Sequence, residues 1–231
     1  MIGSDKFIVG VVGTANTGKT TFIKDVVESD WNKMRDKDYA WTTYGKDYRE
    51  IISSRGLSIN RNGNEECQKV IHETLKNNIL EAVNEPFLRR IIMDRTIIDS
   101  FAYTYWHYRY GTAYISTDTL SKMWSDVVQL SKLYTRILYI PLDKCVDINV
   151  VDDKFRDTNF DYRKQIDAIF HSILSSLYLS DMNYHNIMDI YGSRAERVEW
   201  FIRTETIMNN DYNRLKDNFD NSMNVFDEEN K

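Results

Sequence analysis

Two glycines, a lysine and a threonine near the amino terminus have a spacing that suits phosphate chemistry. Four residues separate Gly13 from Gly18, and Lys19 and Thr20 follow directly in VGVVGTANTGKTTF. Glycines at the two ends of a tight turn leave it sterically open, so that the N–H groups of residues 14–20 converge on phosphate oxygens. Lys19 would bridge the β- and γ-phosphates, while the Thr20 hydroxyl would bind Mg²⁺. The pattern predicts a phosphate loop (residues 13–20), with Lys19 exposed until a phosphate binds.

The predicted ATP contacts come from this loop and from one later turn. In the loop they are Gly13, Thr14, Ala15, Asn16, Thr17, Gly18, Lys19, Thr20 and Thr21. Gly192 and Ser193 follow the last expected strand in YGSRAERV. They present backbone groups to the adenine ring or form only a turn and a helix cap, and the sequence leaves both alternatives open.

An acid and an arginine end a short apolar run in IIMDRTIIDS. Ligands bind at the carboxyl edge of open parallel sheets, where Asp94 would lie. Asp94 would hold Mg²⁺ or accept a proton from an attacking hydroxyl, and Arg95 would bind a phosphate with two hydrogen bonds. A salt-bridged pair that closes the strand is the alternative. Asp99 is either a helix-cap carboxylate or an acceptor for a substrate hydroxyl.

A charged segment, DDKFRDT at 152–158, lies between an expected strand and an expected helix. It predicts a lid at about 150–159, in which Arg156 supplies positive charge to the transferring phosphoryl group. A solvated surface loop is the alternative. The predicted catalytic residues are thus Lys19, Asp94, Arg95 and Arg156, and the predicted metal ligands are Thr20 and Asp94.

Short apolar runs alternate with segments of helical spacing, as in a parallel sheet covered by helices. The strands are expected at 6–13, 39–44, 91–94, 136–141 and 186–192. The helices are expected from Lys19 onwards and at 47–54, 65–84, 97–110, 117–133, 160–180 and 194–210, with a loop at 53–64. The pattern predicts a three-layer α/β/α sandwich with a mainly parallel five-stranded sheet. We expect a single domain over 1–215 and a flexible acidic tail over 216–231.

Composition narrows the partners and the compartment. The formal net charge of −5 argues against a long nucleic acid as partner. Two isolated cysteines, Cys67 and Cys145, suggest reduced thiols, and the sequence has no long apolar stretch. We therefore expect a cytoplasmic protein that binds a small nucleoside or nucleotide and no membrane; a homodimer stays open.

Four stretches, in order, resemble the phosphate-loop kinases related to ribosylnicotinamide kinase and thymidylate kinase, including phage-encoded nucleoside and nucleotide kinases. They are GTANTGKTTF, DYREIISSRGLSINRNGNEECQKVI, IIMDRTIIDSFAYTYW, and DDKFRDTNFDYRKQID with GSRAERVE. The resemblance covers nearly the whole chain and implies ATP and Mg²⁺ as cofactors. It also implies that Tyr48 and Arg49 face the acceptor and that Gln68 lies near its pocket. Such kinases tend to have a glycine in the lid where this chain has Lys154 and Phe155.

The expected function is Mg²⁺-dependent transfer of the γ-phosphoryl group of ATP to a nucleoside monophosphate or a nucleoside. The predicted substrate-binding residues are Tyr48, Arg49, Gln68, Arg95 and Asp99. Arg49, Arg95 and Arg156 together offer more positive charge than the phosphates of ATP alone require. This surplus of charge favours a monophosphate as acceptor. Two other functions remain open, namely an ATPase switch and a kinase that acts on a hydroxymethylated base in DNA.

Overall fold

The phosphate loop follows directly after β1 (Phe7–Val12), the central strand of a parallel sheet. The computed structural model describes residues 6–111, 113–145, 157–180 and 186–207. Within them, one sheet has the order β2-β3-β1-β4-β5, and all of its strand pairs are parallel. Its strands are β1 (Phe7–Val12), β2 (Thr42–Thr43), β3 (Arg90–Asp94), β4 (Arg136–Tyr139) and β5 (Ile187–Asp189). The predicted fold class is confirmed.

Apart from α2, the helices occupy the intervals that the sequence predicts for them. They are α1 (Lys19–Glu28), α2 (Asp30–Lys33), α3 (Tyr48–Ser54), α4 (Glu65–Asn84), α5 (Ile97–Tyr110), α6 (Thr117–Leu130), α7 (Phe160–Ser180) and a last helix at 194–207. Short 3₁₀ turns lie at Asn60–Asn62 and Ser131–Leu133. The sequence missed α2 and the turn at Asn60–Asn62, which lies inside the expected loop. Most of the predicted lid, with Arg156, and the whole tail at 216–231 lie outside the described residues.

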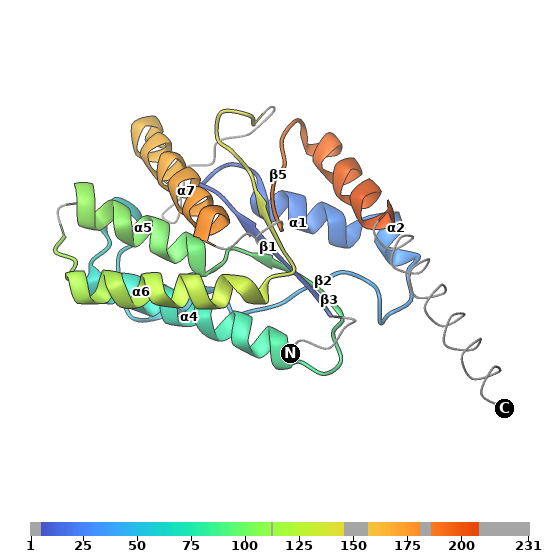
Figure 1. The fold of residues 1–231 in the computed structure, drawn as a ribbon, viewed down its shortest axis with the longest axis horizontal. Helices are drawn as coiled ribbons and strands as arrows, with labels where there is room; N and C mark the ends of the chain where they lie inside the picture. Colours follow the sequence, from blue (N-terminus) through green and yellow to red (C-terminus); the bar gives the residue numbers. More distant parts are fainter. Residues whose placement is uncertain (1–5, 112, 146–156, 181–185, 208–231) are drawn as a thin grey trace.

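The two faces of the sheet are covered by different helices (Figure 1). Ile8 and Val12 of β1 pack in the apolar cluster that α4, α5, α6 and α7 complete. Val9 and Val11 pack in a second cluster with α1 and the last helix. Side chains alternate between the faces of a strand, so a strand buried on both faces has an almost continuous apolar sequence. This arrangement explains the unbroken run in β1.

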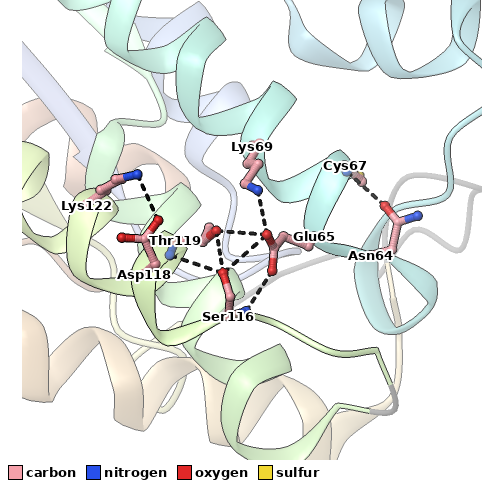
Figure 2. Close-up of polar contacts among 8 residues, drawn as sticks. All are labelled: Asn64, Glu65, Cys67, Lys69, Ser116, Asp118, Thr119 and Lys122. Atoms are coloured by element: carbon pink, nitrogen blue, oxygen red, sulfur yellow. Dashed lines mark hydrogen bonds and ion pairs between the residues drawn. The ribbon is translucent and has the colours of Figure 1, made fainter.

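Glu65, the first residue of α4, holds that helix against the start of α6 (Figure 2). Its Oε2 accepts a hydrogen bond from the backbone N of Ser116 at 2.6 Å. Its Oε1 accepts hydrogen bonds from Thr119 Oγ1 at 2.8 Å and from Lys69 Nζ at 2.5 Å. Ser116 is the N-cap of α6. These contacts position α4, which carries Gln68 to the site described below.

None of the helices in the described ranges is both long enough and apolar enough to span a bilayer.

Candidate active site

Backbone conformation gives the phosphate loop its shape. Gly13, Asn16 and Gly18 have positive φ values of 140°, 57° and 85°. A Cβ on Gly13 would also lie 2.7 Å from the carbonyl oxygen of Ile140, the residue after β4. The left-handed region is open to glycine and tolerated by asparagine, so the sequence TANTG suits this turn. The loop is therefore built with the glycines where the motif predicts them.

Lys19 begins α1 and folds back onto its own loop. Its Nζ donates hydrogen bonds to the carbonyl oxygens of Gly13 and Thr14, each at 2.6 Å. The side chain is buried, which contradicts the expected exposure; these two carbonyls satisfy the ammonium inside the loop. Burial, and after it the neighbouring Arg95, lower the pKa of Lys19 to about 8 against the opposing effects of Asp99 and Asp94. The lysine nevertheless stands at the phosphate loop, as predicted.

The remaining loop residues occupy the positions that the motif gives them. Thr14, Ala15 and Thr17 are buried, whereas Thr20 and Thr21 are exposed in the first turn of α1. The backbone N of Ala15 donates to the Tyr103 hydroxyl at 3.1 Å. The loop therefore contacts α5 as well as its own helix.

Thr20 and Asp94 form the pair that was predicted to hold a metal ion. Thr20 Oγ1 donates a hydrogen bond to Asp94 Oδ2 at 2.5 Å. The other carboxylate oxygen, Oδ1, is buried and has no hydrogen-bond partner in the described part of the chain. Mg²⁺ prefers oxygen ligands and usually takes one or two from the protein, with the rest from water and phosphates. A hydroxyl and a carboxylate beside a phosphate loop fit this preference.

Arg95 lies beside the aromatic rings of Tyr48 and Tyr103. Its φ of 78° is uncommon for arginine, and its guanidinium lies 5.6 Å from the ring centre of Tyr48 and 5.8 Å from that of Tyr103. Its Nη1 is 3.9 Å from Asp99 Oδ1. Adjacent in sequence, Asp94 and Arg95 thus face different partners, Thr20 and Asp99. Neither contact is the salt bridge between Asp94 and Arg95 that the sequence left as the alternative.

Asp99 caps helix α5. Its Oδ2 accepts a hydrogen bond from the backbone N of Thr96 at 2.8 Å, and the Thr96 side chain accepts from the backbone N of Asp99 in return, which completes a capping box. Oδ2 of Asp99 therefore has the helix-cap role that the sequence gave as one of the two alternatives for this residue. Burial raises the pKa of Asp99 to about 6, and this shift is opposed by Lys19 and Arg95.

Two adjoining pockets lie beside these residues, and each is partly continuous with solvent. The first is a narrow cavity of about 20 Å³, and Tyr48, Gln68, Arg95 and Asp99 are among the residues that line it. The second has a volume of about 300 Å³, and Arg49 and Asp94 are among its lining residues. Both pockets share Tyr48 and Arg95. The structure thus brings all five residues predicted to bind the substrate to one region.

Gly192 and Ser193 form a turn and a helix cap, as one of the two alternatives had it. The backbone N of Ser193 donates to Glu196 Oε2 at 2.7 Å, and the backbone N of Glu196 approaches Ser193 Oγ at 3.4 Å. Gly192 has a φ of 93° and pairs with Cys145 in an isolated parallel bridge. This cap begins the last helix. The contact of Gly192 and Ser193 with adenine stays a prediction.

Arg163 and Arg197 contact the phosphate loop, although no sequence motif points to either of them. Arg163 donates to the carbonyl oxygens of Ala15 and Asn16, and Arg197 donates to that of Thr17. They stand in RKQID and SRAERV, where nothing local distinguishes them from surface arginines. Only the packing of α7 and the last helix against the loop reveals them.

No protein-family model and no curated protein sequence matches the chain. Solved structures do. The structure titled NadR protein in complex with NR matches with a TM-score of 0.59 and 16% identity, over 83% of this chain and 49% of that chain. NadR with NAD and AMP-PNP matches with a TM-score of 0.54 and 15% identity, over 83% and 47%. The chain therefore spans about half the length of these NadR chains.

Deoxyadenosine kinase from M. mycoides, with the products dCMP and dCDP, matches over nearly its whole length. The TM-score is 0.52 and the identity 13%, over 88% of this chain and 98% of that chain. Identities this low concern the fold. The described residues thus have the three-layer α/β/α fold of the P-loop nucleoside kinases, as the sequence resemblance predicted.

Proposed function

We propose that this protein transfers the γ-phosphoryl group of ATP to a hydroxyl group of a nucleoside. The observation that carries the proposal is the position of Asp94. Its carboxylate bonds to Thr20 in the first turn after the phosphate loop, and it also lines the larger pocket. The neighbouring Arg95 lines both pockets. A phosphate donor on the loop and an acceptor in the pocket would therefore meet at Asp94.

The proposed roles follow from these positions. The loop N–H groups and Lys19 bind the phosphates of ATP, while Thr20 and Asp94 are the residues that would hold Mg²⁺. When bound, Mg²⁺ neutralises negative charge on the phosphate oxygens. Asp94 is also placed to accept the proton of the attacking hydroxyl. Catalysis of this kind depends mainly on positioning and on electrostatic stabilisation.

The ion pairs favour a nucleoside over a nucleoside monophosphate as acceptor. Arg49 pairs with Asp47 at 3.3 Å, and Arg95 lies 3.9 Å from Asp99. Two of the arginines that favoured a monophosphate therefore have carboxylate partners of their own. The fold match to a deoxyadenosine kinase, over 98% of that chain, agrees with a nucleoside acceptor. A monophosphate remains the second candidate, because Nε of the buried Arg95 has no hydrogen-bond partner among the described residues.

The test has two parts. ADP release is measured with a panel of nucleosides and their 5′-monophosphates, and the best pair is then titrated calorimetrically in the presence of a non-hydrolysable ATP analogue. We expect the nucleoside to bind at least as tightly as its monophosphate, and Arg49→Ala to leave that ratio unchanged. Arg55→Ala, at the exposed end of the same helix, is the matched control.

Two other results point elsewhere. A monophosphate that binds at least about tenfold more tightly, with the preference lost in Arg49→Ala and Arg95→Ala but not in Arg55→Ala, makes the monophosphate the acceptor. ADP release that no acceptor in the panel accelerates contradicts the kinase proposal and favours an ATPase switch.

A further inference from the structure

We propose that Arg163 and Arg197 are positioning residues that hold the phosphate loop in its anion-binding shape from its outer side. The inference rests on the proposed function only in assuming that the loop binds nucleotide phosphates. It concerns the donor side of the site and is independent of the identity of the acceptor.

Arg163 reaches the loop from the first turns of α7. Its Nε donates to the carbonyl oxygen of Ala15 and its Nη2 to that of Asn16, both at 3.1 Å. The residue is only 5% exposed. A planar guanidinium presents several donors in a fixed geometry, so one side chain can bind two successive carbonyls. Asn16 has a φ of 57°. This conformation costs free energy and persists where the surrounding contacts offset that cost.

Arg197 reaches the next peptide from the last helix. Its Nη1 donates to the carbonyl oxygen of Thr17 at 2.7 Å, and its Nε donates to that of Gly192 at 3.0 Å. A Cβ on Gly18 would lie 3.2 Å from the same Nη1, so this glycine also leaves room for the arginine. Arg197 therefore joins the phosphate loop to the turn after β5.

The carbonyl oxygens of residues 13–17 all accept hydrogen bonds from cationic side chains. Lys19 binds the first two, Arg163 the next two and Arg197 the fifth. Carbonyls held in this way direct loop N–H groups toward the side where an anion would bind, and the N–H of Ala15 meets the Tyr103 hydroxyl in this structure. The proposed function uses the Lys19 ammonium on the phosphates. Once it is used there, Arg163 and Arg197 still hold the carbonyls of residues 15–17.

The test measures binding of the donor alone. Calorimetry gives the affinities of the full chain for AMP-PNP and for inorganic tripolyphosphate, with no acceptor present. We expect Arg163→Gln and Arg197→Gln to weaken both ligands by at least about tenfold. Arg163→Lys keeps the charge but loses the two-carbonyl geometry, so we expect an affinity between those of wild type and Arg163→Gln. Arg194→Gln, which removes an exposed ion pair with Asp25 from the same helix as Arg197, is the control and should bind like wild type.

Steady-state kinetics separates positioning from direct catalysis. Loop positioning predicts a raised KM for ATP with kcat changed by less than about threefold at saturating ATP. Wild-type affinity in both glutamine variants, with only a lower melting temperature, overturns the inference and gives the arginines a purely structural role. A fall in kcat that exceeds the rise in KM overturns it too, because the arginines would then act on the reacting phosphoryl group.

Two further results keep the inference separate from the proposed function. A wild-type protein that binds neither AMP-PNP nor tripolyphosphate overturns both. Should the glutamine variants fail to fold, Arg163→Lys and Arg197→Lys decide. Reduced affinity for both ligands in these lysine variants supports the inference, and unchanged affinity overturns it.

Discussion

The hydroxyl of Thr20 lies 2.5 Å from Oδ2 of Asp94, although 74 residues separate the two in the sequence. The parallel register of the sheet explains this contact. Val11 of β1 stands opposite Asp94, the last residue of β3, so both strands end at the same edge. The phosphate loop then carries the chain from β1 to Thr20 in the first turn of α1. Strand pairing thus places a hydroxyl and a carboxylate where one Mg²⁺ could use both.

Asp94→Asn tests this pair. The amide keeps the size of the carboxylate and an oxygen that can accept the Thr20 hydrogen bond, but it brings no negative charge to a metal ion and no base to a hydroxyl. We expect phosphoryl transfer to fall by at least about 100-fold, while affinity for AMP-PNP without Mg²⁺ changes by less than about threefold. Turnover assays and calorimetry measure the two effects. An unchanged rate with a lower melting temperature favours a structural role for Asp94.

Lys19→Met tests the lysine of the phosphate loop. Methionine retains a buried apolar stem and removes the ammonium that Gly13 and Thr14 hold. We expect transfer to fall by at least about 100-fold with the fold intact, because the lost charge is the one proposed to stabilise the phosphates. Lys24→Met is the control, since Lys24 lies exposed on the same helix in a pair with Glu28. Near-normal turnover of Lys19→Met contradicts the assignment of the loop.

The fold could be predicted because its signals are local. The run FIVGVV is apolar throughout, as a strand buried on both faces requires, and Asn64 and Ser116 stand as N-caps at the starts of α4 and α6. The glycines of the phosphate loop likewise indicate a backbone with positive φ values, which glycine adopts more readily than other residues. Alternating strands and helices then leave few topologies besides a parallel sheet.

Parts of the site that depend on distant contacts could not be predicted. Arg163 lies 148 residues from Ala15, and Arg197 lies 180 residues from Thr17. The burial of Lys19 depends on carbonyls that only the folded loop directs toward it. The pair of Arg95 with Asp99 also depends on the folded backbone, because Arg95 precedes α5 and has a φ of 78°, so helical spacing does not predict the contact.

The Glu65 contacts shown in Figure 2 predict acid sensitivity. The Lys69 ammonium, then the backbone N–H of Ser116 and the hydroxyl of Thr119, lower the pKa of Glu65 to about 2. A lowered pKa in the folded state adds stability above the ordinary carboxyl pKa, and this stability is lost as the pH falls toward 2. We expect Glu65→Gln to reduce the melting temperature at pH 7 and to narrow its difference from wild type at pH 3. Glu66→Gln, at the exposed next position, is the control.

A melting temperature of Glu65→Gln that stays equally far below wild type at both pH values would contradict this account. The Glu65 contacts would then stabilise the protein independently of the charge.

Asp99 predicts the opposite pH dependence. Burial raises its pKa to about 6, while Lys19 and Arg95 oppose the shift and Asp94 adds to it. The folded protein therefore holds this proton more tightly than the unfolded chain, so the contribution of Asp99 to stability falls as the pH rises from about 4 to 6. Asn in its place can still accept the hydrogen bond from Thr96 at the start of α5, and it carries no buried charge.

We therefore expect Asp99→Asn to be at least as stable as wild type at about pH 7.5. At about pH 4.5 we expect its free energy of unfolding, relative to that of wild type, to be lower than at pH 7.5. Urea unfolding at the two pH values measures the free energies. The control is Asp118→Asn, which removes an exposed carboxylate paired with Lys122 on α6. If Asp99→Asn is instead the less stable protein at pH 7.5 and matches wild type at pH 4.5, then Lys19 and Arg95 outweigh burial, and the ionised carboxylate stabilises the site.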